Sequence, residues 1–515
     1  MKRREFVKKS GSSFLFTAFA GSILPNVLTS CQNGKKEIPQ VMPELFDEFM
    51  QYDAIGLSEL IKTKQISPAE LLEVVIKRIE YFNPKINAVN IKLYDRARKM
   101  ILNTNTNSLF AGVPVLIKDM IDIGGVLRTD GSKLMQNNIP LESVPYIVEL
   151  EKSGLTIVGR TNVPEFASHS NTWNELYGKT LNPWDVTKTV FGSSGGSSAA
   201  VAAGIVPLAH GTDGAGSNRI PPNACGVFGF KPTRGRLAFG EKGGADDFLK
   251  ANCGISRSVR DNEQLFIATQ KRANNPFTTV QTSSKNLPLK PLKIGYIRTG
   301  LQGYEVDPEI VAKQDEIAKL LTSMGHQVQE VTIPLKGDDF YDQFNIFFLT
   351  KFVPLVNNIM ANNSAYTKTE DITELTNFVK TEAIFAKDFN DTEIEKATDY
   401  IKNYIPTIFK SMFEENDVLF SAVCPIKTQP VDFLNPMKDS FEDKQFVVGQ
   451  TLSLTSFANI CGHPAMSVPL SNIDNLPLGS MFQAPNGKDE LLYQLAYQLE
   501  ETKPWKDQWP EMSYK

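Results

Sequence analysis

Cysteine is scarce in this chain. Only five cysteines occur among 515 residues, and those after Cys31 are widely spaced: Cys225, Cys253, Cys424 and Cys461. Zinc sites use closely spaced pairs of cysteine or histidine, and disulfide scaffolds carry many cysteines in a short chain. Neither pattern is present. We therefore expect no metal site, and we expect the four later cysteines to be buried free thiols.

An excess of charge of one sign is also missing. The chain has 54 lysines and arginines against 58 aspartates and glutamates, a net charge of −4. Proteins that bind nucleic acid present a basic surface to the phosphates, and this balance provides none. We therefore expect no nucleic-acid partner. The length allows one large domain or two to three ordinary ones.

The first thirty residues differ from the rest. MKRREFVKKS carries five basic residues, an apolar run follows, and the segment ends in LTSC at Cys31. A basic start, a short apolar stretch and small residues before a cleavage site are typical of an export signal. Arg3-Arg4 resembles a twin-arginine signal, and LTSC resembles a bacterial lipobox, whose cysteine carries the lipid. We expect a signal peptide over 1–30, a tether over 31–50, and a periplasm-facing envelope lipoprotein anchored in the membrane by its lipid.

Strand and helix patterns alternate along the rest of the chain. Short apolar strands end at Lys118, near Arg160 and at Asp213, and amphipathic helices separate them. This alternation predicts an α/β domain over 51–510, with a mixed, largely parallel sheet. The segment at about 336–415 is rich in helix patterns and phenylalanine, and we expect it to be a helical elaboration. Ligand sites in α/β sheets lie beyond the carboxyl ends of strands.

Two glycine-rich loops lie near these strand ends. GSSGGSS begins at Gly192, and DGAGS begins at Asp213. No lysine follows the glycines, which excludes a phosphate-binding loop. Gly-x-Ser-x-Gly around Ser194 matches a nucleophile elbow, with His326 or His463 as the base, but neither histidine lies in a convincing motif.

A third interpretation needs no histidine. A lysine can take the proton of a serine hydroxyl if the amine is neutral, which requires a pKa well below about 10.4. Burial lowers a lysine pKa, and Lys118 ends an apolar strand. Consecutive small residues after Asp213 can direct backbone N–H groups at an oxyanion.

Five motifs in order resemble the amidase signature family. They are AGVPVLIKDMIDIGG, IVGRTNVPEFA, GKTLNPWD, the run from GSSGGSS to RGRL, and FANICGHPAMSVPL. The resemblance spans about residues 55–500. It implies the family's fold and an amidase acting on a small-molecule amide without a cofactor.

The resemblance also implies roles for particular residues. Lys118 matches the family's base, Ser193 its bridging serine after a cis peptide bond, and Ser217 its nucleophile. The backbone of Gly214, Ala215, Gly216 and Ser217 would form the oxyanion hole, and Asp213 would brace the loop by an ion pair with Arg219.

The chain departs from the family pattern at two positions. Ala215 and Phe191 stand where the family usually has glycine, so Ala215 would be strained if its φ were positive.

Two other functions fit the resemblance: a non-catalytic envelope lipoprotein with the amidase fold, and the glutaminase subunit of a tRNA-dependent amidotransferase. Export argues against the second, because transfer RNA is cytoplasmic.

Overall fold

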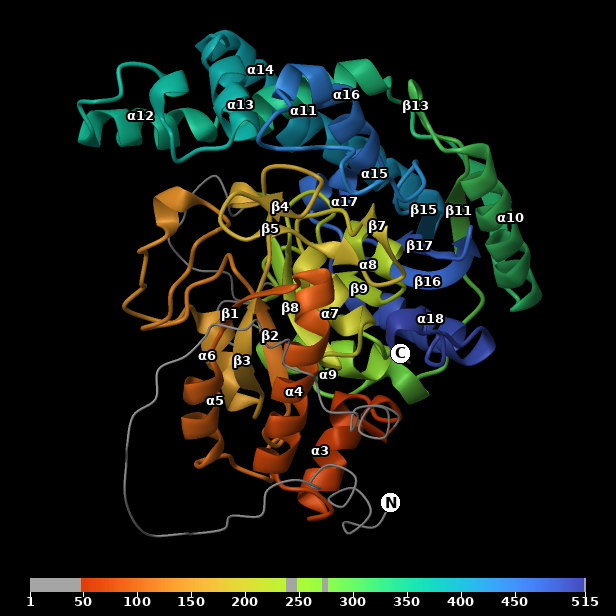
Figure 1. The fold of residues 1–515 in the computed structure, drawn as a ribbon. Helices are drawn as coiled ribbons and strands as arrows, with labels where there is room; N and C mark the ends of the chain where they lie inside the picture. The colour runs from red at the N-terminus through yellow and green to blue at the C-terminus, as the bar shows by residue number, and fades with distance from the viewer. Residues whose placement is uncertain (1–47, 238–247, 271–276, 514–515) are drawn as a thin grey trace, which may run out of the picture.

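An eleven-stranded mixed sheet runs through the computed structural model, which describes residues 48–237, 248–270 and 277–513 (Figure 1). The predicted signal peptide over 1–30, Cys31 and most of the tether lie outside the described residues. In spatial order the strands are β1 (Val89–Lys92), β3 (Thr156–Thr161), β2 (Pro114–Lys118), β8 (Leu208–Asp213), β10 (Ala251–Ser256), β9 (Phe228–Lys231), β16 (Ala465–Ile473), β17 (Leu476–Gln483), β15 (Val418–Ala422), β11 (Lys293–Ile297) and β14 (Gln327–Val331).

The sheet is parallel at two places and antiparallel elsewhere. β3, β2 and β8 are parallel neighbours, as are β15, β11 and β14. Among the described strands the other neighbours are antiparallel and more numerous. The α/β fold with a mixed sheet is confirmed, but the sheet is less parallel than expected. One reason is the hairpin of β16 and β17, where Asp474 and Asn475 both have positive φ, as in a two-residue hairpin turn.

Helices flank the sheet, and α4 (Pro68–Ile86) illustrates how the sequence starts and stops them. Ser67 and Glu70 form a capping box at its start. Pro84 does not stop the helix, which continues for two residues to Ile86 and is followed by the left-handed Asn87. The other helices of the body are α3 (Ala54–Lys62), α5 (Tyr94–Ile101), α6 (Pro145–Lys152), α7 (Gly195–Ala202), α8 (Ile220–Cys225), α9 (Val259–Thr269), α10 (Pro308–Ser323), α17 (Ser456–Cys461) and α18 (Asp489–Thr502).

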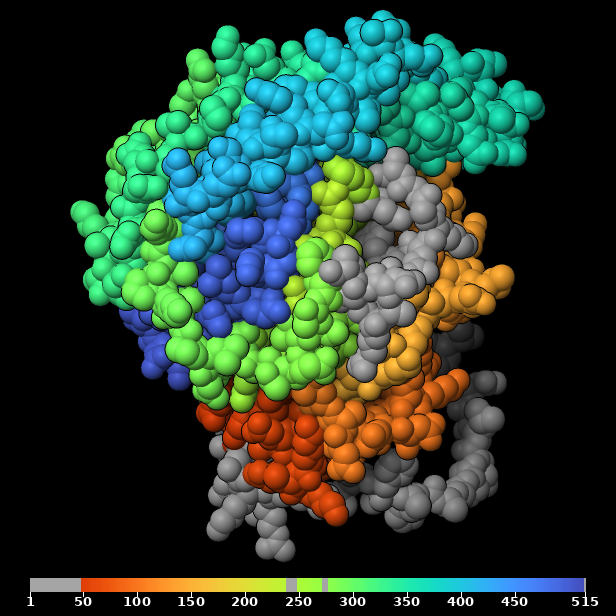
Figure 2. Space-filling view, turned by 180° about the vertical axis from the view of Figure 1, so that it is seen from behind, coloured from red at the N-terminus to blue at the C-terminus, as the bar shows by residue number. Residues whose placement is uncertain are grey.

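Six further helices form a cap over one end of the sheet. They are α11 (Gly337–Leu349), α12 (Phe352–Asn362), α13 (Asn377–Lys387), α14 (Asp391–Asp399), α15 (Ile405–Glu415) and α16 (Phe441–Leu452). Figures 1 and 2 show the cap lying across the top of the body from both sides. Part of the cap has a hydrophobic core of its own, which includes Phe352, Phe378 and Phe441. The phenylalanines of α11 are partly core, since Phe340 and Phe344 are buried.

Candidate active site

Two neighbouring strands deliver polar residues to one edge of the sheet. Lys118 is the last residue of β2 and Asp213 the last residue of β8, and these strands are parallel. Their carboxyl ends therefore lie side by side. Arg160, at the third predicted strand end, does not join them. Its side chain is buried and donates a hydrogen bond to the main-chain oxygen of Ile121 at 2.9 Å.

The first glycine loop is tightly packed. The peptide bond between Gly192 and Ser193 is cis, as expected, and α7 begins two residues later. A Cβ on Gly196 would lie 2.5 Å from the main-chain nitrogen of Asn162, so only glycine allows this approach. The Ser197 hydroxyl donates to the main-chain oxygen of His210 at 2.8 Å, which ties α7 to β8. The small residues thus serve close packing, and the loop is no linker.

The structure brings the three residues of the predicted triad together. The Nζ atom of Lys118 lies 2.7 Å from the Oγ of Ser193, and this Oγ lies 2.9 Å from the Oγ of Ser217. Lys118 also contacts the Oγ of Ser194 at 2.9 Å and the Oγ1 of Thr212 at 2.8 Å. An unbroken chain of hydrogen bonds therefore links a lysine amine to two serine hydroxyls from separate loops.

The surroundings of Lys118 favour its neutral form. Its side chain is fully buried, and burial lowers its pKa to about 7. The Asp213 carboxylate acts in the opposite direction, and the Lys250 ammonium lowers the pKa further. A lysine with this pKa is an amine in a large fraction of molecules at neutral pH, and the amine can accept a proton.

The Asp213 carboxylate organises the second glycine loop. It forms the predicted ion pair with Arg219, at 2.9 Å between fully buried side chains. It also accepts hydrogen bonds from the main-chain N–H of Gly216 at 2.7 Å and of Asn218 at 3.1 Å. Burial alone would raise the pKa of Asp213, but the charges of Arg219 and Lys231 and the side-chain amide of Asn459 hold it at about 2. Asn459, which we did not predict, donates to the same carboxylate at 2.9 Å.

One of the predicted oxyanion donors is already engaged. Because the N–H of Gly216 binds Asp213, it faces the buried carboxylate, and we withdraw it from the predicted oxyanion hole. The N–H groups of Gly214, Ala215 and Ser217 are not bound by that carboxylate and remain candidates for the hole. Gly216 has a φ of +134°, so glycine is needed there for the backbone conformation.

The two departures from the family pattern have different consequences. Ala215 is not among the residues with positive φ, so the expected strain does not arise there. Phe191 does have a positive φ of 54°, a conformation that favours glycine. Its ring is fully buried and packs edge-on against Phe433, with 5.7 Å between the centroids.

Neither histidine of the nucleophile-elbow interpretation contacts Ser194. His326 bonds to the main-chain nitrogen of Leu292 and to Gln498, and His463 packs against Phe409 and Phe413. The described cysteines are buried free thiols, as expected: Cys225, Cys253, Cys424 and Cys461.

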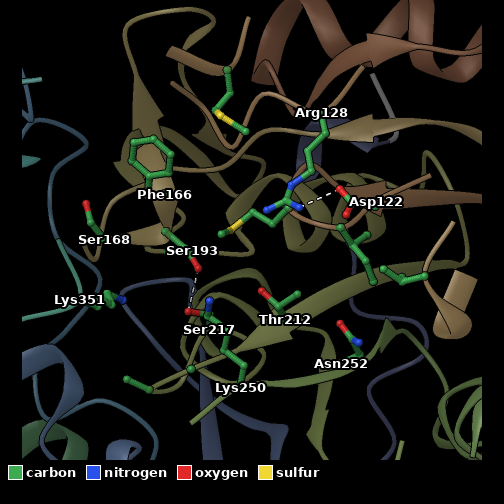
Figure 3. Close-up of a pocket in the computed structure, with 18 of the residues that line it drawn as sticks. Asp122, Arg128, Phe166, Ser168, Ser193, Thr212, Ser217, Lys250, Asn252 and Lys351 are labelled. Carbon is green, nitrogen blue, oxygen red and sulfur yellow. Dashed lines mark hydrogen bonds and ion pairs between the residues drawn. The ribbon is translucent and has the colours of Figure 1, made fainter. Parts of the chain in front are cut away.

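Ser193 and Ser217 open into a cavity of about 850 Å³ (Figure 3). Ser193, Ser217 and the first residues of the second glycine loop line it, together with apolar side chains such as Met120 and Phe166. The cap contributes Phe348 and Lys351, and Lys250, the residue before β10, also lines the cavity. We did not predict these three residues from the sequence, because no local motif connects them to the triad.

The chain matches the family model described as Amidase over residues 70–493. It is 32% identical over 482 residues to the 6-aminohexanoate-cyclic-dimer hydrolase of Paenarthrobacter ureafaciens, covering 89% of this chain and 96% of that one. Identity to a glutamyl-tRNA(Gln) amidotransferase subunit from Fusobacterium nucleatum is 29% over 495 residues, covering 88% and 97%. The fold is similar to a 6-aminohexanoate cyclic dimer hydrolase complexed with substrate, with a TM-score of 0.82, 28% identity, and 90% and 99% of the two chains covered.

Proposed function

Because the chain belongs to the amidase signature family, we propose that it hydrolyses a carboxamide with Ser217 as nucleophile, Ser193 as proton relay and Lys118 as base. The observation that carries this proposal is the hydrogen-bonded chain of 2.7 Å and 2.9 Å from Lys118 through Ser193 to Ser217 at the cavity. The same series of hydrogen bonds argues against a non-catalytic protein, because it connects a buried amine to two serine hydroxyls that line a cavity.

The first half-reaction forms an acyl-enzyme. Ser217 Oγ attacks the amide carbonyl carbon while its proton passes to Ser193, whose own proton passes to the amine of Lys118. The N–H groups of Gly214, Ala215 and Ser217 would stabilise the negative charge that develops on the carbonyl oxygen. The C–N bond then breaks, and the leaving nitrogen takes the proton back from Lys118 through Ser193. The second half-reaction repeats these transfers with water as the attacking group, which releases the carboxylic acid and restores the Ser217 hydroxyl.

A matched pair of variants tests this function. Ser217→Ala removes the nucleophile, whereas Ser198→Ala removes a buried hydroxyl of α7 that has no hydrogen-bond partner among the described residues. We expect Ser217→Ala to lower kcat/KM on a panel of amides by about a thousandfold or more, and to abolish labelling by a serine-directed fluorophosphonate. Ser198→Ala should retain both. Hydrolysis or labelling that persists in Ser217→Ala would contradict the assignment of the nucleophile.

We further propose that the protein is a lipid-anchored component of the cell envelope that faces the periplasm. The support comes from the basic start, the apolar run and the LTSC motif ending at Cys31. Cys31→Ala is the test, since it removes only the acceptor of the lipid. We expect the native chain in the membrane fraction and Cys31→Ala in the soluble fraction or uncleaved. Equal membrane association and normal cleavage of both would contradict the anchor.

A further inference from the structure

One short helix, α17, holds the second glycine loop from outside the cavity. The Thr455 hydroxyl, at the start of α17, donates to the main-chain oxygen of Ala215 at 2.6 Å. The side-chain amide of Asn459 donates to the main-chain oxygen of Asp213 at 3.0 Å. The two side chains are four residues apart, so they share one face of the helix. Both are buried, and neither lines the cavity, whereas Gly214 and Ala215 do.

Thr455 is used differently from most threonines at the start of a helix. Such a side chain usually caps the N–H groups of its own first turn, but Thr455 makes no such bond. Its hydroxyl has one proton to donate, and the 2.6 Å contact with Ala215 is far shorter than the 3.4 Å to the main-chain oxygen of Leu452. A Cβ on Gly216 would lie 2.3 Å from the Oγ1 of Thr455, so the loop lies directly against this hydroxyl.

Asn459 is oriented so that its amide nitrogen faces the loop. Its Oδ1 accepts a hydrogen bond from Arg219 at 2.7 Å, which leaves the nitrogen for acceptors. The two amide hydrogens are shared among the main-chain oxygen of Asp213, its carboxylate at 2.9 Å and the main-chain oxygen of Leu249 at 2.9 Å. Asn459 therefore holds the main chain of Asp213 as well as its side chain.

The peptide between Asp213 and Gly214 is oriented by this contact. A trans peptide bond directs its C=O and its N–H to opposite sides, and the bonds of this loop are trans. Because Asn459 holds the Asp213 oxygen, the Gly214 N–H points away from α17. This N–H is one of the candidate oxyanion donors, and Gly214 lines the cavity.

The peptide between Ala215 and Gly216 is held on both sides. Thr455 donates to its oxygen, and its N–H donates to the Asp213 carboxylate at 2.7 Å. This peptide joins the two other candidate donors, because the Ala215 N–H precedes it and the Ser217 N–H follows it. Neither of the two peptide planes can rotate without breaking a hydrogen bond to α17.

We propose that Asn459 and Thr455 are positioning residues for the oxyanion hole. They do not line the cavity, but they hold the peptide planes of the loop so that its N–H donors are in place before the carbonyl oxygen gains its charge. Donors arranged in advance stabilise such a charge without reorientation at the moment of reaction. The inference rests on the proposed amidase function and assigns the residues that orient the donors of the same site.

Two variants of Thr455 separate its hydroxyl from its volume. Thr455→Val keeps the shape and loses the donor, whereas Thr455→Ser keeps the donor. For the amide that the wild type hydrolyses fastest, we expect Thr455→Val to lower kcat by about tenfold or more with little change in KM, because misplaced donors stabilise the transition state less. Thr455→Ser should restore kcat. Ser456→Ala is the matched control, because the Ser456 hydroxyl donates to the main-chain oxygen of Leu452 at 3.0 Å and not to the loop.

The rate of labelling by a fluorophosphonate examines the same hole without an amide substrate, since negative charge also develops on the phosphoryl oxygen when Ser217 attacks. Thr455→Val and Asn459→Leu should both be labelled about tenfold or more slowly than the wild type. The pH midpoint of labelling in Thr455→Val should equal that of the wild type, because Thr455 is not among the groups that shift the pKa of Lys118. A loop that had merely lost its structure would change KM and this midpoint as well.

The possible results distinguish this proposal from the proposed function. Wild-type rates in Thr455→Val or Asn459→Leu would overturn the positioning role while Ser217-dependent hydrolysis stood. Equal losses in Thr455→Val and Thr455→Ser, or a shifted pH midpoint in Thr455→Val, would overturn it too. Hydrolysis or labelling that persists in Ser217→Ala would instead refute the proposed function.

Discussion

The Ser194 hydroxyl lies 2.9 Å from the Nζ of Lys118 and donates its own hydrogen to the main-chain oxygen of Thr212 at 3.1 Å. A hydroxyl has a single proton, so Ser194 can only accept from Lys118. The Oγ1 of Thr212, at 2.8 Å, provides a second acceptor for the amine. When Lys118 is neutral, its two N–H bonds can point to these oxygens, and its lone pair is directed at Ser193.

Removal of the Ser194 hydroxyl should therefore misorient the base. In Ser194→Ala we expect kcat to fall by about tenfold to a hundredfold, because catalysis is sensitive to small displacements of the reacting groups. KM should change little, since Ser194 does not line the cavity. Steady-state kinetics of Ser194→Ala, with Ser198→Ala as the control, measures the effect. Equal activity of the two variants would contradict the orienting role of Ser194.

The pH dependence should report the state of Lys118. The amine must be neutral to accept a proton, and its pKa is about 7. We expect kcat/KM to rise with pH through about 7 and then level off. The charged groups that act on Lys118 are Asp213, Asp130 and Lys250. In Lys250→Met the loss of a neighbouring cation should raise the pKa and move the rising limb to higher pH. A flat profile between pH 5 and pH 9 would exclude a lysine base.

The burial of Lys118 should lower the stability of the folded protein. A pKa that falls from 10.5 in the unfolded chain to about 7 in the folded protein means that folding releases a proton between these values. The penalty is complete below pH 7 and disappears as the pH rises toward 10.5. Lys118→Met should therefore melt at a higher temperature than the wild type at pH 7, and the advantage should shrink by pH 9.5. Calorimetric melting at both pH values measures this, and a constant difference would contradict it.

The ion pair of Asp213 and Arg219 should be essential for the loop. Both side chains are fully buried, so Arg219→Met leaves an unpaired carboxylate in the interior. We expect the free energy of unfolding to fall by about 3–5 kcal/mol. Adding Asp213→Asn, which removes the charge, should recover part of this loss. If the double variant were less stable than Arg219→Met, the uncompensated charge would not be the cause. Chemical denaturation of the wild type, Arg219→Met and the double variant measures these differences in the free energy of unfolding.

At position 191 a glycine variant should be more stable than an alanine variant, which is the reverse of the usual order. The φ of 54° at Phe191 favours glycine, and the buried Phe191 ring supplies the packing. Both Phe191→Ala and Phe191→Gly lose the ring, which costs about 3–5 kcal/mol. Glycine tolerates the left-handed conformation, so Phe191→Gly should be about 1 kcal/mol more stable than Phe191→Ala. Melting temperatures of the two variants compare them directly, and a less stable glycine variant would contradict backbone strain at this position.

The sequence predicted the site best where the chemistry of a residue and a sequence motif indicated the same role. Lys118 at the end of an apolar strand was a candidate base on its chemistry alone, whereas the resemblance to the amidase signature family predicted that Lys118, Ser193 and Ser217 meet. The engaged N–H of Gly216 escaped prediction, because a motif names residues but does not say where each N–H points. Lys351 escaped because its approach to the serines depends on how the cap packs on the body. The antiparallel share of the sheet was underestimated for a similar reason, since strand pairing is decided by contacts far apart in the sequence.

β9 and β16 are neighbours in the middle of the sheet, with Gly229 opposite Ser467. During synthesis the edge of β9 therefore remains unpaired until β16 leaves the ribosome, when the chain is almost finished. An unpaired strand edge invites association with other chains. Nascent chains truncated before β16 should thus depend on chaperones and be inactive, even though they already contain Lys118, Ser193 and Ser217.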